Sequence, residues 1–357
     1  MEIGIVGLPN VGKSTLFNAL TGAGIAAENF PFTTIEPNIG IVPLPDERLN
    51  VLAEKNKSAK IIPAGIRFVD IAGIVEGASK GEGMGNKFLS HIRSVEAITH
   101  VVRCFKNDDV INVLGDLDPI RAADIIETEL LLADLEQAEK ALERVKKLAK
   151  QKDPDALAKQ NALQDVIAGF NDGKSVRVQN VDKKLIAEFQ FLTEKPLLYV
   201  ANIDEDNSSP EVIAALEARA QKEGAGLVPL CTKMEAEILE LDPQERVSYY
   251  EAAGITSPGL ARLAQAGQKL LDLVCFYTSG PKETRAWLIP RGTLAPKAAG
   301  KIHSDIERGF IRAEIYKYDD LIKYGSEQAL KAKGLAALEG KEYAMEDGDV
   351  VHFRFSV

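Results

Sequence analysis

The chain has 357 residues, a length that predicts two or three domains of about 100–200 residues each. Its 45% apolar and 27% charged residues are typical of globular proteins, and the net charge of −10 excludes a uniformly basic nucleic-acid-binding coat but not a local basic patch. No apolar run reaches the ~18 residues of a membrane span, and the scattered Cys104, Cys231 and Cys275 favour a reducing compartment over a disulfide framework.

Residues 1–125 predict alternating strands and helices. The N-terminus lacks the basic region and the longer apolar run of a signal peptide, and predicts a short apolar strand at Ile3–Gly7 instead. A helix is expected from Ser14 to Thr21. Further strands are expected at Gly65–Asp70 and Ile98–Phe105. This alternation predicts an α/β domain with a parallel sheet covered on both faces.

The segment GLPNVGKS at residues 7–14 lies between the first strand and the first helix and fits the P-loop pattern G-x-x-x-x-G-K-[ST]. Its glycines allow successive backbone N–H groups to point at phosphate oxygens, and the helix N-terminus adds partial positive charge. The alternative, a glycine-rich turn without a ligand, does not explain the flanking strand and helix. The predicted phosphate-side contacts are Asn10, Val11, Gly12, Lys13, Ser14 and Thr15, with Lys13 at the β- and γ-phosphates and Ser14 on Mg²⁺.

Two further segments are candidates for the phosphate end of the site. Asp70 and Gly73, in the run DIAG, suit an Mg²⁺ partner and a γ-phosphate sensor, although an aspartate that ends a strand is more often a helix cap. The glycine-rich residues 77–85 are expected to order around a γ-phosphate, unless they form a plain surface loop. Thr34 is the preferred second protein ligand of Mg²⁺, and Thr33 is its nearest competitor.

The middle of the chain predicts two long helices. Apolar residues recur at heptad spacing from Leu131 to Ala149, Pro154 then starts a second helical run, and Asn171-Asp172-Gly173 ends it. We interpret the pair as an antiparallel helical hairpin; two ordinary surface helices are the alternative. Because the flanking motifs are much farther apart than the roughly 30 residues of a βαβ unit, the hairpin is expected to be an insertion in the nucleotide domain.

The run NIDE at residues 202–205 follows a predicted strand, at the place where GTPases carry N-K-x-D. Glu205 is one methylene longer than the aspartate that accepts two hydrogen bonds from guanine, which favours adenine, read by backbone groups around Ile203. A second base-side loop follows the strand predicted at Gly226–Cys231. The predicted base-side contacts are Asn202, Ile203, Glu205 and Cys231.

The last 80 or so residues change character. Short strands at Trp287–Ile289, Phe310–Tyr316 and Val350–Val357, with a helical stretch at Ala298–Gly309, predict a small α+β module. The expected domains are a discontinuous nucleotide-binding domain at 1–127 and 191–275, a helical hairpin at 128–190, and a C-terminal module at 276–357.

The motifs at residues 7–15, 29–38 and 202–205 together resemble those of the Obg-like ATPases, the YchF subfamily of translation-factor-class P-loop NTPases, and the resemblance covers the whole chain. It implies a GTPase-like α/β domain with a coiled-coil insertion and a C-terminal TGS domain of β-grasp fold. It also implies a cytoplasmic, Mg²⁺-dependent ATPase that hydrolyses slowly, binds GTP more weakly, and associates with the ribosome through its RNA or its proteins. Neither a membrane nor DNA is expected as a partner.

The resemblance also bears on turnover. Ile74 stands where many GTPases use a glutamine to orient water, and Asn10 matches the asparagine that holds K⁺ in potassium-stimulated relatives. The family usually carries a histidine where this chain has Asn112, whose amide can hydrogen-bond water but cannot act as a general base. Slow turnover is therefore expected, with Lys13, Asp70, Gly73 and Asn112 as the candidate catalytic set.

Three other functions fit parts of the sequence. A GTPase of the Obg type would bind GTP more tightly than ATP. A nucleotide-locked binding module with negligible turnover is favoured by Ile74 and Asn112. An RNA-binding adaptor would use the hairpin and the C-terminal module, although the lysines of the hairpin also suit a solvated helix face. These hairpin lysines are Lys146, Lys147, Lys150 and Lys152.

Overall fold

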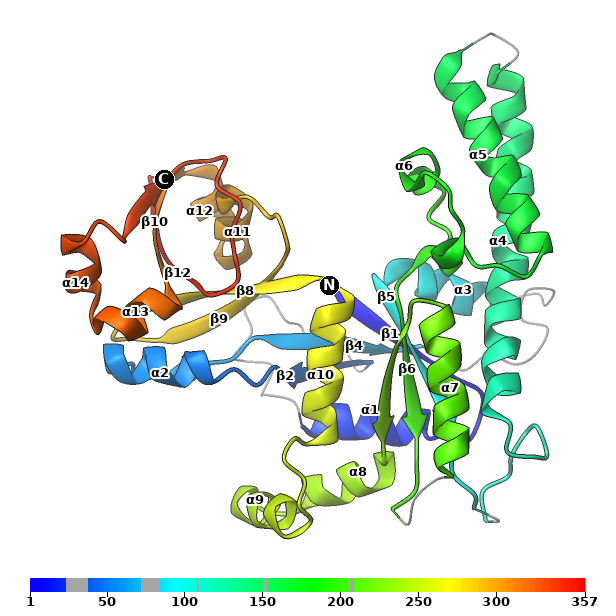
Figure 1. Cartoon of the computed structure of the whole chain (residues 1–357), viewed down its shortest axis with the longest axis horizontal. Helices are drawn as coiled ribbons and strands as arrows, with labels where there is room; N and C mark the ends of the chain where they lie inside the picture. The colour runs from blue at the N-terminus through cyan, green and yellow to red at the C-terminus, as the bar shows by residue number, and fades with distance from the viewer. Residues whose placement is uncertain (24–37, 72–83, 108, 150–152, 206–208, 357) are drawn as a thin grey trace. The chain divides into compact units, whose positions relative to one another are not determined.

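The structure is a computed structural model that describes residues 1–23, 38–71, 84–107, 109–149, 153–205 and 209–356. Its internal contacts divide the described chain into two compact units. The first unit holds the described residues of 1–23, 38–41 and 67–266, and the second holds those of 42–66 and 267–356. Each unit is built around its own sheet (Figure 1).

The sheet of the first unit has the strand order β2-β4-β1-β5-β6-β7. Its central strands pair in parallel, as the sequence predicts. Every residue of β5 and β6 is buried, because helices cover both faces of this sheet. The strands are β1 (Glu2–Val6), β2 (Ile39–Pro43), β4 (Gly65–Asp70), β5 (Ala97–Arg103), β6 (Leu197–Asn202) and β7 (Gly226–Leu230). The helices of this unit outside the hairpin are α1 (Lys13–Gly22), α3 (Met84–Ser94), α6 (Lys183–Ile186), α7 (Pro210–Lys222), α8 (Thr232–Glu240), α9 (Pro243–Ala252) and α10 (Gly259–Leu270).

The heptad pattern forms the predicted helical hairpin. Helix α4 (Pro119–Ala149) begins well before the heptads, and α5 (Pro154–Asn171) begins at the predicted proline. The carboxylate of Asp153 caps α5 by accepting a hydrogen bond from the N–H of Asp155. The two helices pack through a buried apolar seam that includes Ala138, Val145, Leu163 and Phe170. Packing of one apolar face against the other thus stabilises the pair.

The sheet of the second unit has the order β11-β10-β12-β8-β9-β3 and mixes parallel with antiparallel pairs. Its strands are β3 (Ile61–Ile62), β8 (Leu273–Ser279), β9 (Thr284–Pro290), β10 (Phe310–Lys317), β11 (Ala337–Glu339) and β12 (Asp349–Phe355). Its helices are α2 (Glu47–Asn56), α11 (Ala295–Ile302), α12 (Ser304–Arg308), α13 (Tyr318–Tyr324) and α14 (Glu327–Ala332). Helices with this mixed sheet confirm the α+β character of the C-terminal module.

Two details differ from the sequence-based expectation. Ile61 and Ile62 of β3 pair in parallel with Thr284 and Arg285 of β9, and α2 packs against the same sheet, so α2 and β3 belong to the second unit. A pairing between segments more than 200 residues apart leaves no local signal in the sequence. The helical stretch predicted at Ala298–Gly309 is two helices, because His303 is extended between them and its side chain caps α12.

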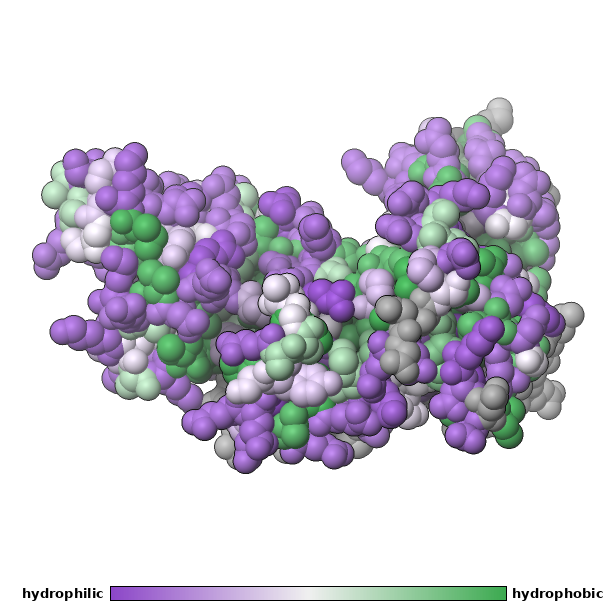
Figure 2. Space-filling model, turned by 60° about the horizontal axis from the view of Figure 1, so that its bottom comes forward, coloured by the Kyte–Doolittle hydropathy of each residue, from purple (hydrophilic) through white to green (hydrophobic). Residues whose placement is uncertain are grey.

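None of the described helices has the length and apolar character needed to cross a membrane. Hydrophilic side chains predominate on the face shown in Figure 2. Isolated exposed apolar residues are normal on the surface of globular proteins. Among the described residues, the most exposed large apolar side chain is that of Ile111, at 77% exposure.

Candidate nucleotide-binding site

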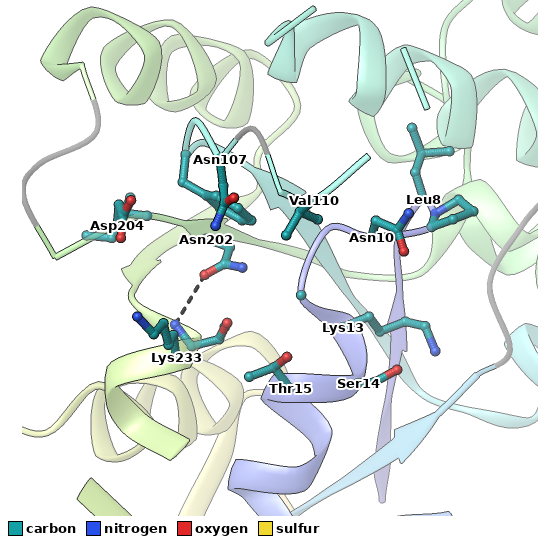
Figure 3. A pocket seen from close by; sticks show the side chains of 15 residues that line it. Leu8, Asn10, Lys13, Ser14, Thr15, Asn107, Val110, Asn202, Asp204 and Lys233 are labelled. Carbon is teal, nitrogen blue, oxygen red and sulfur yellow. Dashed lines mark hydrogen bonds between the residues drawn. The ribbon is translucent and has the colours of Figure 1, made fainter. Parts of the chain in front are cut away.

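A cavity of about 780 Å³ opens at the carboxyl ends of the parallel strands of the first unit. Ligands of open α/β sheets bind at this edge. Figure 3 shows Lys13 and Ser14 on one side of the cavity and Asp204 and Lys233 on the other. The lining residues are Leu8, Pro9, Asn10, Gly12, Lys13, Ser14, Thr15, Phe105, Asn107, Val110, Asn202, Ile203, Asp204, Thr232 and Lys233.

The P-loop has the backbone that its glycines permit. Gly12 has a φ of 93° and precedes α1, so the first turn of the helix opens toward the cavity. A Cβ on Gly12 would lie 2.1 Å from Asn202 Nδ2, and a Cβ on Gly7 would lie 2.8 Å from the carbonyl oxygen of Val101. Neighbouring atoms therefore leave no room for a side chain at either position. This steric reason for glycine adds to the one that the motif predicts, the binding of phosphate by the backbone.

The Lys13 ammonium forms an ion pair with Asp70 at the end of β4, with 2.5 Å between Nζ and Oδ1. The two side chains are only 13% and 26% exposed. A cation and a carboxylate thus meet at the phosphate end of the cavity, next to the hydroxyl-bearing Ser14. This group of side chains can hold a polyanion together with a divalent cation.

Asn202 joins the two ends of the cavity. Its side-chain Nδ2 donates to the carbonyl oxygen of Val11 at 2.9 Å, and its Oδ1 accepts from the N–H of Thr232 at 3.1 Å (dashed in Figure 3). The residue is 3% exposed, so both bonds are shielded from water. Asn202 therefore fixes the P-loop relative to the loop that begins α8.

Only some of the predicted base-side residues line the cavity. Asn202 and Ile203 line the cavity, whereas Glu205 does not and its neighbour Asp204 does. Cys231 is buried at the start of α8, where burial raises the pKa of its thiol, and the next residue, Thr232, reaches the cavity instead.

The predicted phosphate-side and catalytic residues also differ in whether they line the cavity. Val11 is buried and contributes its carbonyl oxygen to Asn202. Asn112 lines a neighbouring hollow and not the cavity itself, and its amide bonds within its own loop, to the backbone of Leu114 and Asp116. Gly73 and Thr34 lie outside the described residues, as does Ile74.

Sequence reasoning missed one wall of the cavity. Phe105, Asn107 and Val110 line it from the loop that follows β5. The signal was available, because β5 was predicted and the carboxyl ends of parallel strands share one edge of the sheet. Thr232 and Lys233, which also line the cavity, belong to the second base-side loop that the sequence predicted, although Cys231 was the contact chosen from it.

Comparison with known proteins identifies the family of this chain. The chain is 51% identical to the ribosome-binding ATPase YchF of Pasteurella multocida and 50% identical to that of Bacillus subtilis, covering all of this chain and 99–100% of each relative. It belongs to the YchF family. A solved YchF GTPase structure from Schizosaccharomyces pombe covers 99% of this chain and 97% of its own, at a TM-score of 0.87 and 35% identity.

Two family models agree with this membership, and one distant structure shares the fold. Residues 273–356 match the YchF-GTPase C-terminal model, described as a protein of unknown function, and residues 2–154 match a model described as 50S ribosome-binding GTPase. A GTP-binding protein from Pyrococcus horikoshii shares the fold at a TM-score of 0.62 and 20% identity. The resemblance inferred from the motifs is thus confirmed over the full length of this YchF-family chain.

Proposed function

We propose that this YchF-family protein binds ATP with Mg²⁺ in the cavity above the P-loop, hydrolyses it slowly, and acts as a switch that associates with the ribosome. The observation that carries the proposal is the continuous cavity that runs from Lys13 to Ile203. Its phosphate end has a cation and a helix N-terminus, and its far end has the altered N-x-x-E segment. The relatives named ribosome-binding ATPases support the same reading.

The residues at the phosphate end fit a magnesium ion. The Ser14 hydroxyl and the Asp70 carboxylate are the hard oxygen donors that Mg²⁺ prefers, and Asp70 lies at the Lys13 ammonium. Ser14 would hold the ion, with Thr34 as the second hydroxyl and Asp70 in its surroundings. When bound, the ion would neutralise developing charge on the phosphate oxygens. Lys13 and the backbone N–H groups of residues 10–13 would hold the phosphates in place.

The base-side residues support a preference for ATP. Ile203 replaces the lysine that packs along guanine, and Glu205, in place of aspartate, is not among the residues lining the cavity. The position of the guanine-binding aspartate in the GTPase motif is Glu205 here, which lies outside the cavity lining. The carboxylate that does line the cavity, that of Asp204, stands one residue earlier in the motif. Backbone groups around Ile203 would read adenine instead.

Competitive titration of a fluorescent nucleotide with ATP and with GTP tests this preference. ATP should bind at least about tenfold more tightly, a difference of about 1.4 kcal/mol. GTP binding tenfold more tightly than ATP would contradict the adenine assignment and favour the GTPase. Ribosome association is measured separately, by co-sedimentation with each nucleotide over a range of salt concentrations, where a steep loss with salt indicates RNA contact.

A nucleotide-locked binding module with negligible turnover is the second candidate. The observation in its favour is that the Asn112 amide is bonded to its own loop and lies outside the cavity lining. Single-turnover hydrolysis in potassium and in sodium buffer distinguishes the two functions. Phosphate release above background supports the ATPase, and stimulation by K⁺ would support a cation site at Asn10, whose Nδ2 is held by the carbonyl oxygen of Ile111 at 3.2 Å.

A further inference from the structure

Arg103, the last residue of β5, directs its guanidinium into the loop that follows the strand. Its Nε donates to the carbonyl oxygen of Phe105 at 3.2 Å, Nη1 to that of Val110 at 2.9 Å, and Nη2 to that of Asn107 at 2.9 Å. The same guanidinium stacks on the Phe105 ring, 4.5 Å from its centroid. One side chain thus binds three backbone carbonyl groups of this loop.

The partners of Arg103 are unusual for a buried arginine. The residue is 7% exposed, and no carboxylate among the described residues lies within ion-pair distance of it. Burial lowers the pKa of this guanidinium, which still keeps its charge at any physiological pH. The carbonyl dipoles of the loop therefore solvate the charge, and the loop conformation and the arginine depend on each other.

The three residues whose carbonyl groups bind Arg103 are the three that form the wall of the cavity missed by the sequence. Phe105, Asn107 and Val110 line the cavity, and Arg103 itself does not. The loop is also tied to the rest of the site at both ends. The N–H of Cys104 donates to the backbone carbonyl of Asn202 at 2.8 Å, and the carbonyl of Ile111 accepts from Asn10 of the P-loop.

We propose that Arg103 is a positioning residue that shapes the base-side wall of the cavity and thereby sets the affinity for the nucleoside part of the nucleotide, not for its phosphates. This inference rests on the proposed nucleotide function. Its physical basis is that a planar fork with five N–H donors can reach three separate carbonyl groups, whereas a lysine ammonium is a compact point charge and cannot. A loop held in its binding conformation before the ligand arrives also avoids an ordering cost on binding.

The test uses Arg103→Lys and two probes with Mg²⁺ in the full-length chain: a non-hydrolysable ATP analogue, and inorganic tripolyphosphate, which has no base. The matched control is Arg246→Lys. Arg246 also donates to backbone carbonyls, of Leu241 at 2.8 Å and Leu239 at 2.6 Å, but lies outside the cavity lining. Thermal melting of both variants reports the loss of fold stability that is common to them.

Arg103→Lys should weaken the ATP analogue by about tenfold, as expected when about 1.4 kcal/mol of binding is lost, and leave tripolyphosphate within about twofold. The KM for ATP should rise while kcat at saturation stays within about twofold. Arg246→Lys should leave both probes within about twofold. Equal weakening of the two probes, or no weakening of either, would overturn the proposal.

A second variant covers the case in which Arg103→Lys does not fold. Asp109→Pro removes the exposed backbone N–H that donates to Asn107 Oδ1 at 2.8 Å, and so disturbs the same loop without changing a lining residue. It should weaken the ATP analogue selectively; an unchanged affinity would overturn the proposal. If the wild-type protein binds the ATP analogue no better than tripolyphosphate, the proposed function itself fails. If wild type prefers the ATP analogue and the variants bind both probes as wild type does, only the role of Arg103 is contradicted.

Discussion

The ammonium of Lys13 lies 2.5 Å from the carboxylate of Asp70, so the lysine of the P-loop already has an anionic partner. A triphosphate that enters the cavity has to compete with this carboxylate for the same cation. The carboxylate also repels phosphate oxygens unless a divalent cation lies between them. If the proposed function holds, Asp70 is expected to make nucleotide binding depend on magnesium.

The first prediction concerns Asp70→Asn. In EDTA, ATP should bind this variant about three- to tenfold more tightly than wild type, because the competing charge is gone. With Mg²⁺, hydrolysis should fall, because the carboxylate near the ion is lost. Titration with a fluorescent ATP analogue in EDTA and in Mg²⁺ measures both affinities. Asp124→Asn is the control, since Asp124 pairs with Arg219 and lies outside the cavity lining; an equal gain of affinity there would count against the explanation.

The second prediction concerns the clamp formed by Asn202. Asn202→Ala leaves the Val11 carbonyl and the Thr232 N–H buried without their partner, which costs about 2–4 kcal/mol of folding free energy for the two groups. ATP affinity should fall together with the melting temperature, because the P-loop loses its fixed position. Asn202→Asp keeps an acceptor for Thr232 but cannot donate to Val11, and should not restore binding. Wild-type affinity in Asn202→Ala would refute the clamp.

The third prediction concerns the attachment of the hairpin. Asp134 of α4 is fully buried and accepts from the N–H groups of Leu192 and Thr193 at 2.9 and 2.8 Å, and from the Thr193 hydroxyl at 2.8 Å. Asp134→Asn turns an N–H₂ group toward these donors and should lower the unfolding free energy by about 2–4 kcal/mol. ATP affinity should stay within about twofold. The exposed Glu136→Gln, on the same helix, should change stability by less than about 0.5 kcal/mol, and a larger loss there would show that charge alone matters.

The fourth prediction concerns pH. Burial, and then the nearby Arg219 and Arg177, lowers the pKa of His100 from 6.5 to about 3. Its buried Nε2 has no hydrogen-bond partner among the residues that the structure describes. The folded protein keeps this imidazole neutral while the unfolded chain takes up a proton below pH 6.5, so stability is lost as the pH falls. At pH 5 the loss from this residue is about 2 kcal/mol.

Calorimetric unfolding at pH 7.5 and pH 5 measures the loss. His100→Leu should show a drop in stability on acidification that is smaller by about 2 kcal/mol. Burial raises the pKa of Asp134 to about 6, which acts in the opposite direction, since stability from that residue increases as the pH falls. Only the difference between wild type and His100→Leu therefore isolates the histidine. Equal pH dependence in the two proteins would contradict the prediction.

Local patterns in the sequence predicted much of this protein. The strand, glycine-rich loop and helix at residues 2–22 are contiguous, and the hairpin follows from heptad spacing, because both depend on residues that are neighbours in the chain. The three motifs, read together, also predicted the YchF family that the comparisons confirm.

Only the tertiary structure decided which side chains, far apart in the sequence, contact one another at the site. Asn202 bonds to a carbonyl 191 residues away, Lys13 pairs with a carboxylate 57 residues away, and β3 joins a sheet whose other strands follow residue 270. Arg103 lies close in sequence to its loop, yet its role depends on which carbonyl groups that loop turns inward. Composition and periodicity report burial and local conformation, whereas such contacts depend on distances that exist only after the chain has closed its long loops.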